Sequence, residues 1–223
     1  MSLVREVRLL PVEDVLEDLK ALPPEEFTLE RIDEYLTGLV LDQGSLKTFL
    51  NFKDGAYTRN LVFKNDLFEV LILCWDIGQK TPVHNHRGQL GWMSVQQGML
   101  SILNYRRIDC SGSCHLTRRW SRVDLHSEIP IAGVGFVAHV SQRETIHQII
   151  NDARFSQKAV SLHIYSRPIE SCVIYDVERQ FCSDKRLTNF TERGKLVVIP
   201  TQETVPAPER PPANATPDSG AVS

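Results

Sequence analysis

The sequence lacks a long hydrophobic run and an excess of positive charge, and both absences narrow the classes of protein it can belong to. No stretch approaches the ~20 consecutive apolar residues of a membrane-spanning helix. The 25 Lys and Arg residues are outnumbered by 28 Asp and Glu residues, and the formal net charge is −3. Because surfaces that bind nucleic acids are usually basic, we expect neither a membrane nor a nucleic acid as a partner.

The sequence is also poor in cysteine. Its 5 cysteines are odd in number and lack the spacing of a disulfide framework, so they should be thiols in a reducing compartment. The N-terminal segment contains Glu6, Glu13 and Asp14 and lacks the apolar stretch of a secretion signal. We therefore expect a cytoplasmic protein. A glycine-rich phosphate loop, a Ser–His–Asp order and a catalytic carboxylate pair are missing as well.

Composition divides the chain into three parts. Residues 1–55 favour helices, with Pro11 at the start of the first, Thr28 as the N-cap of the second, and a short third helix near Leu46. We expect this segment to pack on the domain formed by residues 56–203. Residues 204–223 contain five prolines and few apolar residues, so they should form a disordered tail.

The middle part consists of short apolar runs separated by turn-forming residues. No helical pattern alternates with these runs, which argues against a parallel α/β sheet and favours an antiparallel sandwich or barrel. The expected fold is therefore mainly β with N-terminal helices. The predicted strands lie in Leu67–Trp75, Gly91–Val95, Met99–Tyr105, Val134–His139, Lys158–Tyr165 and Cys172–Val177.

Two histidines with one residue between them suggest a metal site. Side chains two residues apart on a strand point to the same face, so His84 and His86 could bind one ion together. Pro82 before the pair and Gly88 after it suit a strand flanked by tight turns. A His-x-His pair alone is weak evidence, because such histidines are more often structural.

Further polar residues in strand-like contexts strengthen the hypothesis. His147 lies in one such segment, and Ser161, His163 and Tyr165 alternate with Leu162 and Ile164 in another. Three polar side chains on one buried face would need hydrogen-bond partners. The alternatives at this point are a structural hydrogen-bond network or a strand that faces solvent.

The residue types also restrict the metal. Imidazoles suit iron, copper, nickel and zinc, and no carboxylate stands beside the His84–His86 pair. Three neutral histidines leave a divalent ion with its full charge, which favours an anionic ligand such as a thiolate and leaves positions for oxygen. Redox-active iron fits this chemistry better than zinc, although zinc and copper remain open.

The spacing of these histidines resembles the motifs of the cupin superfamily, whose fold is a jelly-roll-like antiparallel β-barrel. Gly78-x5-His84-x-His86-x4-Gly91-x6-Gly98 is similar to the first motif, with Gly91 in place of the usual glutamate ligand. His147-x3-Asn151 is similar to the end of the second motif, although Gln142 and Glu144 replace its usual Pro and Gly. This spacing to Asn151 favours His147 over His139 as the third ligand.

Four blocks within residues 55–180 more specifically resemble cysteine dioxygenase, in the order and spacing of that family. They are Tyr57-Thr-Arg59-Asn-Leu-Val, Leu71-Ile-Leu-Cys-Trp75, His84-Asn-His86 and Ala159-Val-Ser-Leu-His163-Ile-Tyr165-Ser. The resemblance implies an enzyme of cysteine catabolism with one iron(II) ion per chain. Such an enzyme adds both atoms of O2 to the sulfur of L-cysteine and produces cysteine sulfinate.

The resemblance also implies a role for each residue of the site. The metal ligands would be His84, His86 and His147. Arg59 would bind the substrate carboxylate, as the bidentate geometry of guanidinium allows. The remaining substrate-binding residues would be Tyr57, Leu73, Trp75 and Tyr165. The catalytic set would be Ser161, His163 and Tyr165, with the Tyr165 hydroxyl facing the substrate and oxygen.

Two positions distinguish this chain from relatives. Animal members have a cysteine at the position of Gly91, and a thioether links this cysteine to the tyrosine that matches Tyr165. Glycine has no sulfur and cannot form this link, so in this respect the chain resembles the bacterial members. Dioxygenases of 3-mercaptopropionate usually have glutamine at the position of Arg59, so arginine favours cysteine. Oxidation of another small thiol such as 3-mercaptopropionate, and a non-catalytic metal-binding cupin, remain the alternatives.

Two further questions stay open. Cys110-x3-Cys114-His115 lacks a second pair of ligands at the spacing of a zinc site, and the surrounding Ser and Gly residues favour a loop. The oligomeric state does not follow from the sequence, and a monomer is plausible.

Overall fold

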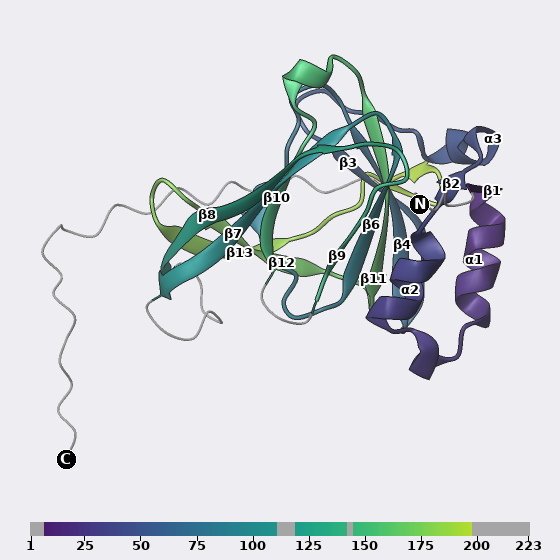
Figure 1. The fold of residues 1–223 in the computed structure, drawn as a ribbon, viewed down its shortest axis with the longest axis horizontal. Coiled ribbons are helices and arrows are strands. Elements are labelled where there is room, and N and C mark those ends of the chain that lie inside the picture. The colour runs from purple at the N-terminus through teal and green to yellow at the C-terminus, as the bar shows by residue number, and fades with distance from the viewer. Residues whose placement is uncertain (1–6, 111–118, 142–144, 198–223) are drawn as a thin grey trace, which may run out of the picture.

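The structure, a computed structural model, describes residues 7–110, 119–141 and 145–197. The predicted tail at 204–223 and the pair Cys114 and His115 lie outside these residues. Strands dominate the described part, and helices cover one side of it (Figure 1). No helix in the described ranges is both long and apolar enough to cross a membrane.

All three predicted helices of the N-terminal part are present: α1 Val12–Ala21, α2 Leu29–Leu36 and α3 Gln43–Leu46. Short 3-10 turns follow α1 and α3 at Pro24–Glu26 and Lys47–Phe49. Thr28 caps α2 as predicted, because its hydroxyl accepts a hydrogen bond of 3.2 Å from the backbone N–H of Arg31.

The N-terminal part also contains two strands that the helical prediction missed. β1 (Arg8–Leu10) and β2 (Leu39–Leu41) pair in parallel and flank the helices. The buried side chain of Gln96 accepts a hydrogen bond of 2.7 Å from the backbone N–H of Leu41 and so ties this pair to the main sheet. Strands of three residues are too short to show a period-two pattern, which explains the omission.

Seven strands form the larger sheet, in the order β15-β14-β3-β4-β11-β6-β9. Only β14 and β3 pair in parallel within it, and the other neighbours are antiparallel. The bounds are β3 Thr58–Lys64, β4 Phe68–Trp75, β6 Gly91–Gln97, β9 Val137–Val140, β11 Ala159–Ser166, β14 Thr191–Glu192 and β15 Lys195–Leu196.

Six further strands are hydrogen-bonded in a closed ring, in the order β10-β5-β12-β13-β8-β7. Their bounds are β5 Val83–His84, β7 Leu100–Cys110, β8 Arg119–Ala132, β10 Ile146–Ile150, β12 Ser171–Asp176 and β13 Phe181–Arg186. Each of the six predicted runs contains a strand of the structure, with shifted ends. The sequence did not predict β3, β14, β15 or the two strands that carry more charged and polar residues, β8 and β13.

The alternation of side chains gives the large sheet two buried faces. On β4, Phe68, Val70 and Ile72 belong to the hydrophobic core that includes α1 and α2, whereas Leu71 and Leu73 belong to a second core inside the β domain. On β11, Leu162 and Ile164 face the helices in the same way. The polar residues between them therefore point into the interior.

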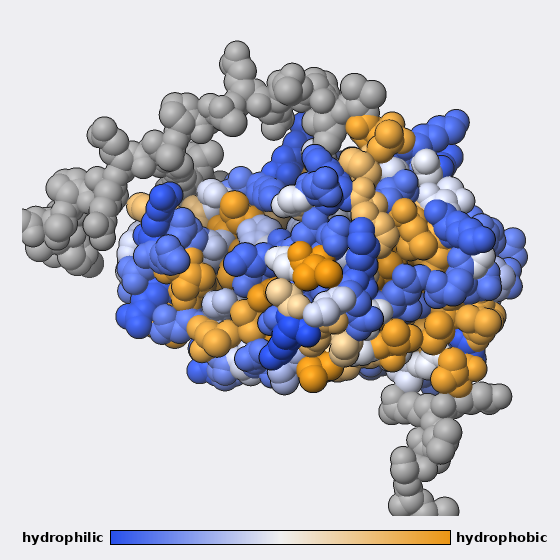
Figure 2. Space-filling model, turned by 90° about the horizontal axis from the view of Figure 1, so that it is seen from above, coloured by the Kyte–Doolittle hydropathy of each residue, from blue (hydrophilic) through white to orange (hydrophobic). Residues whose placement is uncertain are grey.

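Hydrophobic residues on the surface lie in separate groups between hydrophilic ones, on the face that Figure 2 shows. Exposed examples among the described residues include Leu125, Ile131 and Val134. Such scattered residues are normal for a globular protein.

Candidate metal centre and substrate pocket

Antiparallel pairing brings two of the predicted ligands together. His84 is the last residue of β5, and His147 lies directly opposite it on β10. Residues opposite one another in an antiparallel pair project their side chains from the same face. Two histidines that are 63 positions apart in the sequence therefore become neighbours in space.

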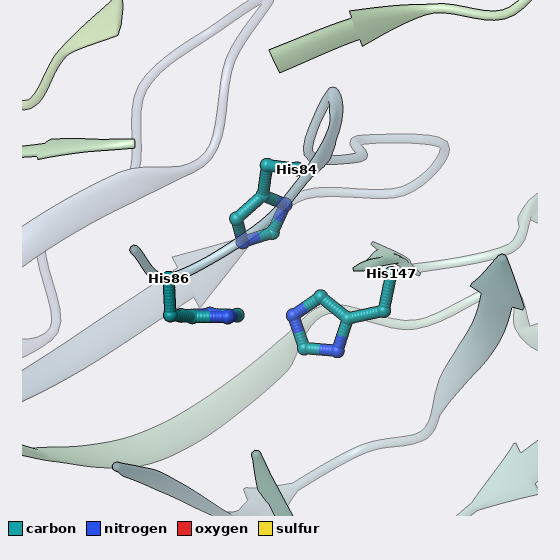
Figure 3. A group of neighbouring side chains, drawn as sticks. All are labelled: His84, His86 and His147. Atoms are coloured by element: carbon teal, nitrogen blue, oxygen red, sulfur yellow. The ribbon is translucent and has the colours of Figure 1, made fainter. Parts of the chain in front are cut away.

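The third histidine completes a triangle. His86 follows the end of β5, and the centroids of the three rings lie 4.9 Å (His84–His86), 4.8 Å (His84–His147) and 4.9 Å (His86–His147) apart. One nitrogen from each ring falls within 4.8 Å of the others, as for a group that could hold a metal ion. Figure 3 shows the rings turned towards a common centre. His139, the rival that the spacing to Asn151 disfavoured as third ligand, is not part of this triangle.

The hydrogen bonds of the rings leave nitrogen atoms free for an ion. Nδ1 of His84 lies 3.0 Å from the carbonyl oxygen of Pro82, which can only accept, so this nitrogen donates and Nε2 keeps its lone pair. Nδ1 of His86 and Nε2 of His147 are buried without a hydrogen-bond partner among the described residues. Because buried polar atoms are normally paired, the donor set fits a bound metal.

Burial also keeps the three imidazoles neutral. It lowers the pKa of His84 to about 4 and that of His147 well below the ordinary value. The pKa of His86 is also well below its ordinary value. Burial is the main cause, and the positive charges that His147 and His84 would carry add to it. Neutral imidazole is the form that binds metals, so the site is prepared for an ion at neutral pH.

The polar residues of β11 form a continuous chain of hydrogen bonds. Nε1 of Trp75 donates to Oγ of Ser161 over 2.9 Å, and the same oxygen lies 2.9 Å from Nε2 of His163. Nδ1 of His163 lies 3.2 Å from the hydroxyl oxygen of Tyr165. Burial raises the pKa of Tyr165, so its phenol remains protonated at neutral pH. The ring of Tyr165 stacks at 5.8 Å on that of His86 and thereby borders the histidine triangle.

Gly91 lies directly below the Tyr165 ring, because it is the cross-strand partner of Tyr165. A Cβ atom at this position would lie 2.7 Å from Cδ1 of Tyr165 and 2.9 Å from Cγ2 of Val140. Contacts this short require a neighbour to move. In this chain glycine therefore permits close packing of the tyrosine, in addition to excluding a thioether.

Arg59 is a buried cation with an incomplete set of partners. Its Nη2 lies 3.4 Å from Oε1 of Glu69, and the two residues are 9% and 4% exposed. The same carboxylate oxygen accepts a hydrogen bond of 3.1 Å from the backbone N–H of Ile169. Nε of Arg59 is buried and lacks a hydrogen-bond partner among the described residues. The guanidinium can therefore still bind an anion.

One narrow cavity of about 20 Å³ is lined by Arg59 together with His84, His86 and His163. Its wall also contains Tyr57, Leu73 and Tyr165, for which the family resemblance implies a role in substrate binding. Trp75 lies behind this wall: it is fully buried and stacks at 4.6 Å on the ring of Tyr57. It therefore supports Tyr57 and Ser161 from behind, where the sequence predicted a lining residue.

A larger cavity of about 300 Å³ reaches the other side of the triangle. His86, His147 and Tyr165 are among its lining residues, together with apolar side chains of the barrel. His139 lies on its wall, where its Nδ1 is 3.0 Å from Oδ1 of Asp33 on α2. This ion-pair geometry explains the position of His139 away from the metal triangle.

Sequence reasoning missed two charged residues near the pocket. Glu69, the partner of Arg59, lies in the predicted strand at Leu67–Trp75, where an acidic residue among apolar ones was the available signal. Lys185 also lines the pocket, but it comes from β13, a strand that the sequence did not predict.

The sequence of the chain is also similar to those of known proteins. The family model described as Cysteine dioxygenase type I matches residues 27–178. The chain belongs to this family. This family membership makes it a dioxygenase, and together with the observed strands it confirms the predicted cupin-type fold.

Curated relatives carry the same family name. Cysteine dioxygenase type 1 of Danio rerio is 23% identical over 186 residues, which cover 82% of this chain and 88% of the relative. The Homo sapiens protein of that name is 26% identical over 153 residues, or 68% of this chain and 72% of the relative. A solved RmlC-like cupin protein from Desulfovibrio desulfuricans is 20% identical, with a TM-score of 0.38 and coverage of 53% of this chain and 90% of that one.

Metal binding to this family member should release few protons even in mild acid. At pH 5.5, three ordinary histidines with pKa about 6.5 would release about three protons per ion. The lowered pKa values predict release of fewer than about one proton, because the rings are already neutral. Titration calorimetry of the metal-free protein with Co²⁺, in two buffers of different ionisation enthalpy, measures this number. Release of two or more protons would contradict neutral imidazoles.

Substitution of Gly91 by alanine should destabilise the protein. The added methyl group collides with the Tyr165 ring, and overpacking of this kind costs about 1–3 kcal/mol. Urea unfolding of the Gly91→Ala variant measures the loss. The matched control is Gly133→Ala, because no atom lies within 4 Å of a Cβ added at that position. Equal stability of the two variants would show that the close contact at Gly91 does not matter.

Proposed function

We propose that the protein is a non-haem iron(II) dioxygenase that adds both atoms of O2 to the thiol sulfur of L-cysteine and forms cysteine sulfinate. The observation that carries this proposal is the position of Arg59, a buried cation with a free Nε, in the same cavity wall as His84 and His86. A carboxylate anchor beside a metal site fits a small thiol that carries a carboxylate group.

His84, His86 and His147 would hold the iron through neutral nitrogen ligands. Bound iron(II) would supply the redox chemistry that allows a thiol to react with O2. Because the three ligands carry no charge, the full charge of the ion would remain available to attract a thiolate. The absence of a carboxylate from the triangle thus supports a thiol substrate.

Arg59 would orient the substrate from the opposite end. Nη2 of its guanidinium group is held by Glu69, which leaves Nε, and with it an edge of the planar group, for the substrate carboxylate. Hydrogen bonds between ionised partners are about twice as strong as neutral ones. Holding both ends of a three-carbon thiol fixes the position of its sulfur, and this restriction of motion accelerates reactions.

The hydrogen-bond chain of β11 would control the proton of Tyr165. Oγ of Ser161 already accepts from Trp75, so its own hydroxyl can donate to Nε2 of His163. His163 would then donate from Nδ1 to the oxygen of Tyr165. This order leaves the phenolic proton of Tyr165 free to donate towards the substrate and oxygen, as a general acid requires.

The cellular setting is part of the proposal. Among the described residues, Cys74 and Cys172 are buried free thiols. Free thiols are typical of a reducing compartment and support a cytoplasmic enzyme of cysteine catabolism. The expectations of a monomer and of no nucleic-acid or membrane partner stay predictions.

Oxygen consumption with three thiols tests the proposed reaction. After anaerobic loading with iron(II), cysteine should be consumed with O2 uptake and formation of an equal amount of sulfinate. Uptake with 3-mercaptopropionate should be slower, and cysteamine, which lacks a carboxylate, should react most slowly. No uptake with any of the three thiols, despite bound iron, would refute the proposed function and favour a metal-binding cupin without activity.

Replacement of Arg59 should weaken the use of cysteine. A hydrogen bond to a charged group contributes about 1.5–3 kcal/mol, so kcat/KM of Arg59→Gln should fall about 10- to 100-fold. The activity with cysteamine should not fall, because this thiol has no carboxylate. Since Arg59→Gln also leaves Glu69 without its cation, the double variant Arg59→Gln/Glu69→Gln serves as the control for folding. Unchanged kinetics with cysteine would contradict the role of Arg59.

A further inference from the structure

The pocket beside the histidines continues into a second, wider groove of about 220 Å³. Both cavities are lined by Tyr57, Arg59, Lys185 and Leu187, so they meet at these four side chains. The wider groove includes further residues from the segments 53–59 and 185–190. It therefore provides a path from the surface to the metal triangle.

Positive charge dominates this path. The described residues that line the two cavities include four cations, Lys53, Arg59, Lys185 and Arg186, and no aspartate or glutamate. This local excess contrasts with the formal net charge of −3 for the whole chain. A groove of one charge attracts ligands of the opposite charge.

The strand register directs Lys185 towards the metal site. On the antiparallel pair β12–β13, Lys185 lies opposite Cys172, a residue that is 2% exposed and lines the inner pocket. On the other side of β12, Ile174 lies opposite His84. Since cross-strand partners and residues two apart share a face, Lys185 and His84 project from the same face of the barrel wall.

Lys185 also has a free charge. Glu69 is bound to Arg59, and Asp184, the neighbour of Lys185, forms an ion pair with Arg87. No ion pair involves Lys185 within the described ranges of the chain. Burial raises the pKa of Cys172, and the positive charge of Lys185 partly offsets this rise, so the field of Lys185 reaches the wall of the inner pocket.

We propose that Lys185 is a second cationic contact for the substrate and that, together with Arg59, it selects thiols with an anionic end. This inference rests on the proposed function and specifies how its substrate is recognised. Glu69 balances the charge of Arg59, so Lys185 supplies the net positive charge of the inner pocket. Arg59 then provides directed hydrogen bonds, and Lys185 provides the attraction that distinguishes substrates by charge.

The expected effect is moderate, because Lys185 is exposed and its charge is screened by water. Ion pairs of exposed groups contribute up to about 1 kcal/mol, so neutralising Lys185 should reduce kcat/KM for anionic thiols about three- to fivefold. Reversal of the charge should reduce it further. A thiol with a cationic end should show the opposite trend, since the repulsion from Lys185 is removed.

The experiment compares four variants of the full-length, iron-loaded protein: Lys185→Gln, Lys185→Glu, Lys185→Arg and Lys195→Gln. Lys195 is an exposed lysine of β15 and lines neither cavity, so its variant is the control for a general change of charge. The thiols are 3-mercaptopropionate, cysteine and cysteamine, whose tails are anionic, zwitterionic and cationic. Anaerobic titration measures binding without turnover, and oxygen consumption at two ionic strengths gives kcat/KM.

The proposal predicts a shift of preference from anionic towards cationic thiols. Lys185→Gln should lower both the binding affinity and kcat/KM for 3-mercaptopropionate, and Lys185→Glu should lower them further. The same variants should change these values less for cysteine and should raise them for cysteamine. Lys185→Arg and Lys195→Gln should behave as the unmodified protein, and added salt should reduce the differences. If the thiols are oxidised but the ratios of kcat/KM between anionic and cationic thiols are the same in the Lys185 variants as in the unmodified protein, the inference is wrong while the proposed function stands. If no thiol is oxidised, the titrations alone decide the inference.

Discussion

The pairing of β5 with β10 is the constraint on which the candidate site depends. It sets His84 opposite His147, and His86 then needs only the turn after β5 to complete the triangle. The pairing has a second effect, because it encloses the imidazoles and keeps them neutral. One element of strand topology thus provides both the geometry and the protonation state that a metal requires.

The large sheet supports this site because both of its faces are buried. Helices α1 and α2 cover the outer face, so alternate residues of β4 and β11 can be apolar on that side. The inner positions are then free for polar groups, and Ser161, His163 and Tyr165 use them as one hydrogen-bonded chain. Gly91 allows Tyr165 to pack closely against β6. The helices contribute no ligand, but they allow β11 to lie in the interior.

The pocket contains two kinds of positive charge, a buried guanidinium that is paired with a carboxylate and an exposed ammonium group. The Arg59–Glu69 pair is buried, and such pairs contribute little to stability because desolvation offsets the attraction. Their value here is the fixed orientation of a guanidinium group next to the histidines. Lys185 is exposed by comparison, and its contribution is a long-range attraction. A directed contact and an undirected one together suit a small ligand that must be captured from water and then held in one orientation.

The sequence by itself determined the residue types of the site and the elements that carry them. The spacing of His84 and His86, the alternation around His163 and the Tyr57-Thr-Arg59 block all rest on local patterns of two to six residues. The long apolar strands were predicted for the same reason, since alternation and turn residues are visible within a short window. The three-residue strands β1 and β2 were missed because they offer no such window.

Only the tertiary structure decided which of these residues meet. The pairing of β5 with β10 separates His147 from its rival His139, which instead contacts Asp33 of α2. Contacts between distant strands likewise reveal Glu69 as the partner of Arg59 and place Trp75 behind Tyr57. Lys185 enters the pocket through the register of β12 and β13. Pairing between distant strands has no signature in local sequence, because it arises from the closure of the whole barrel.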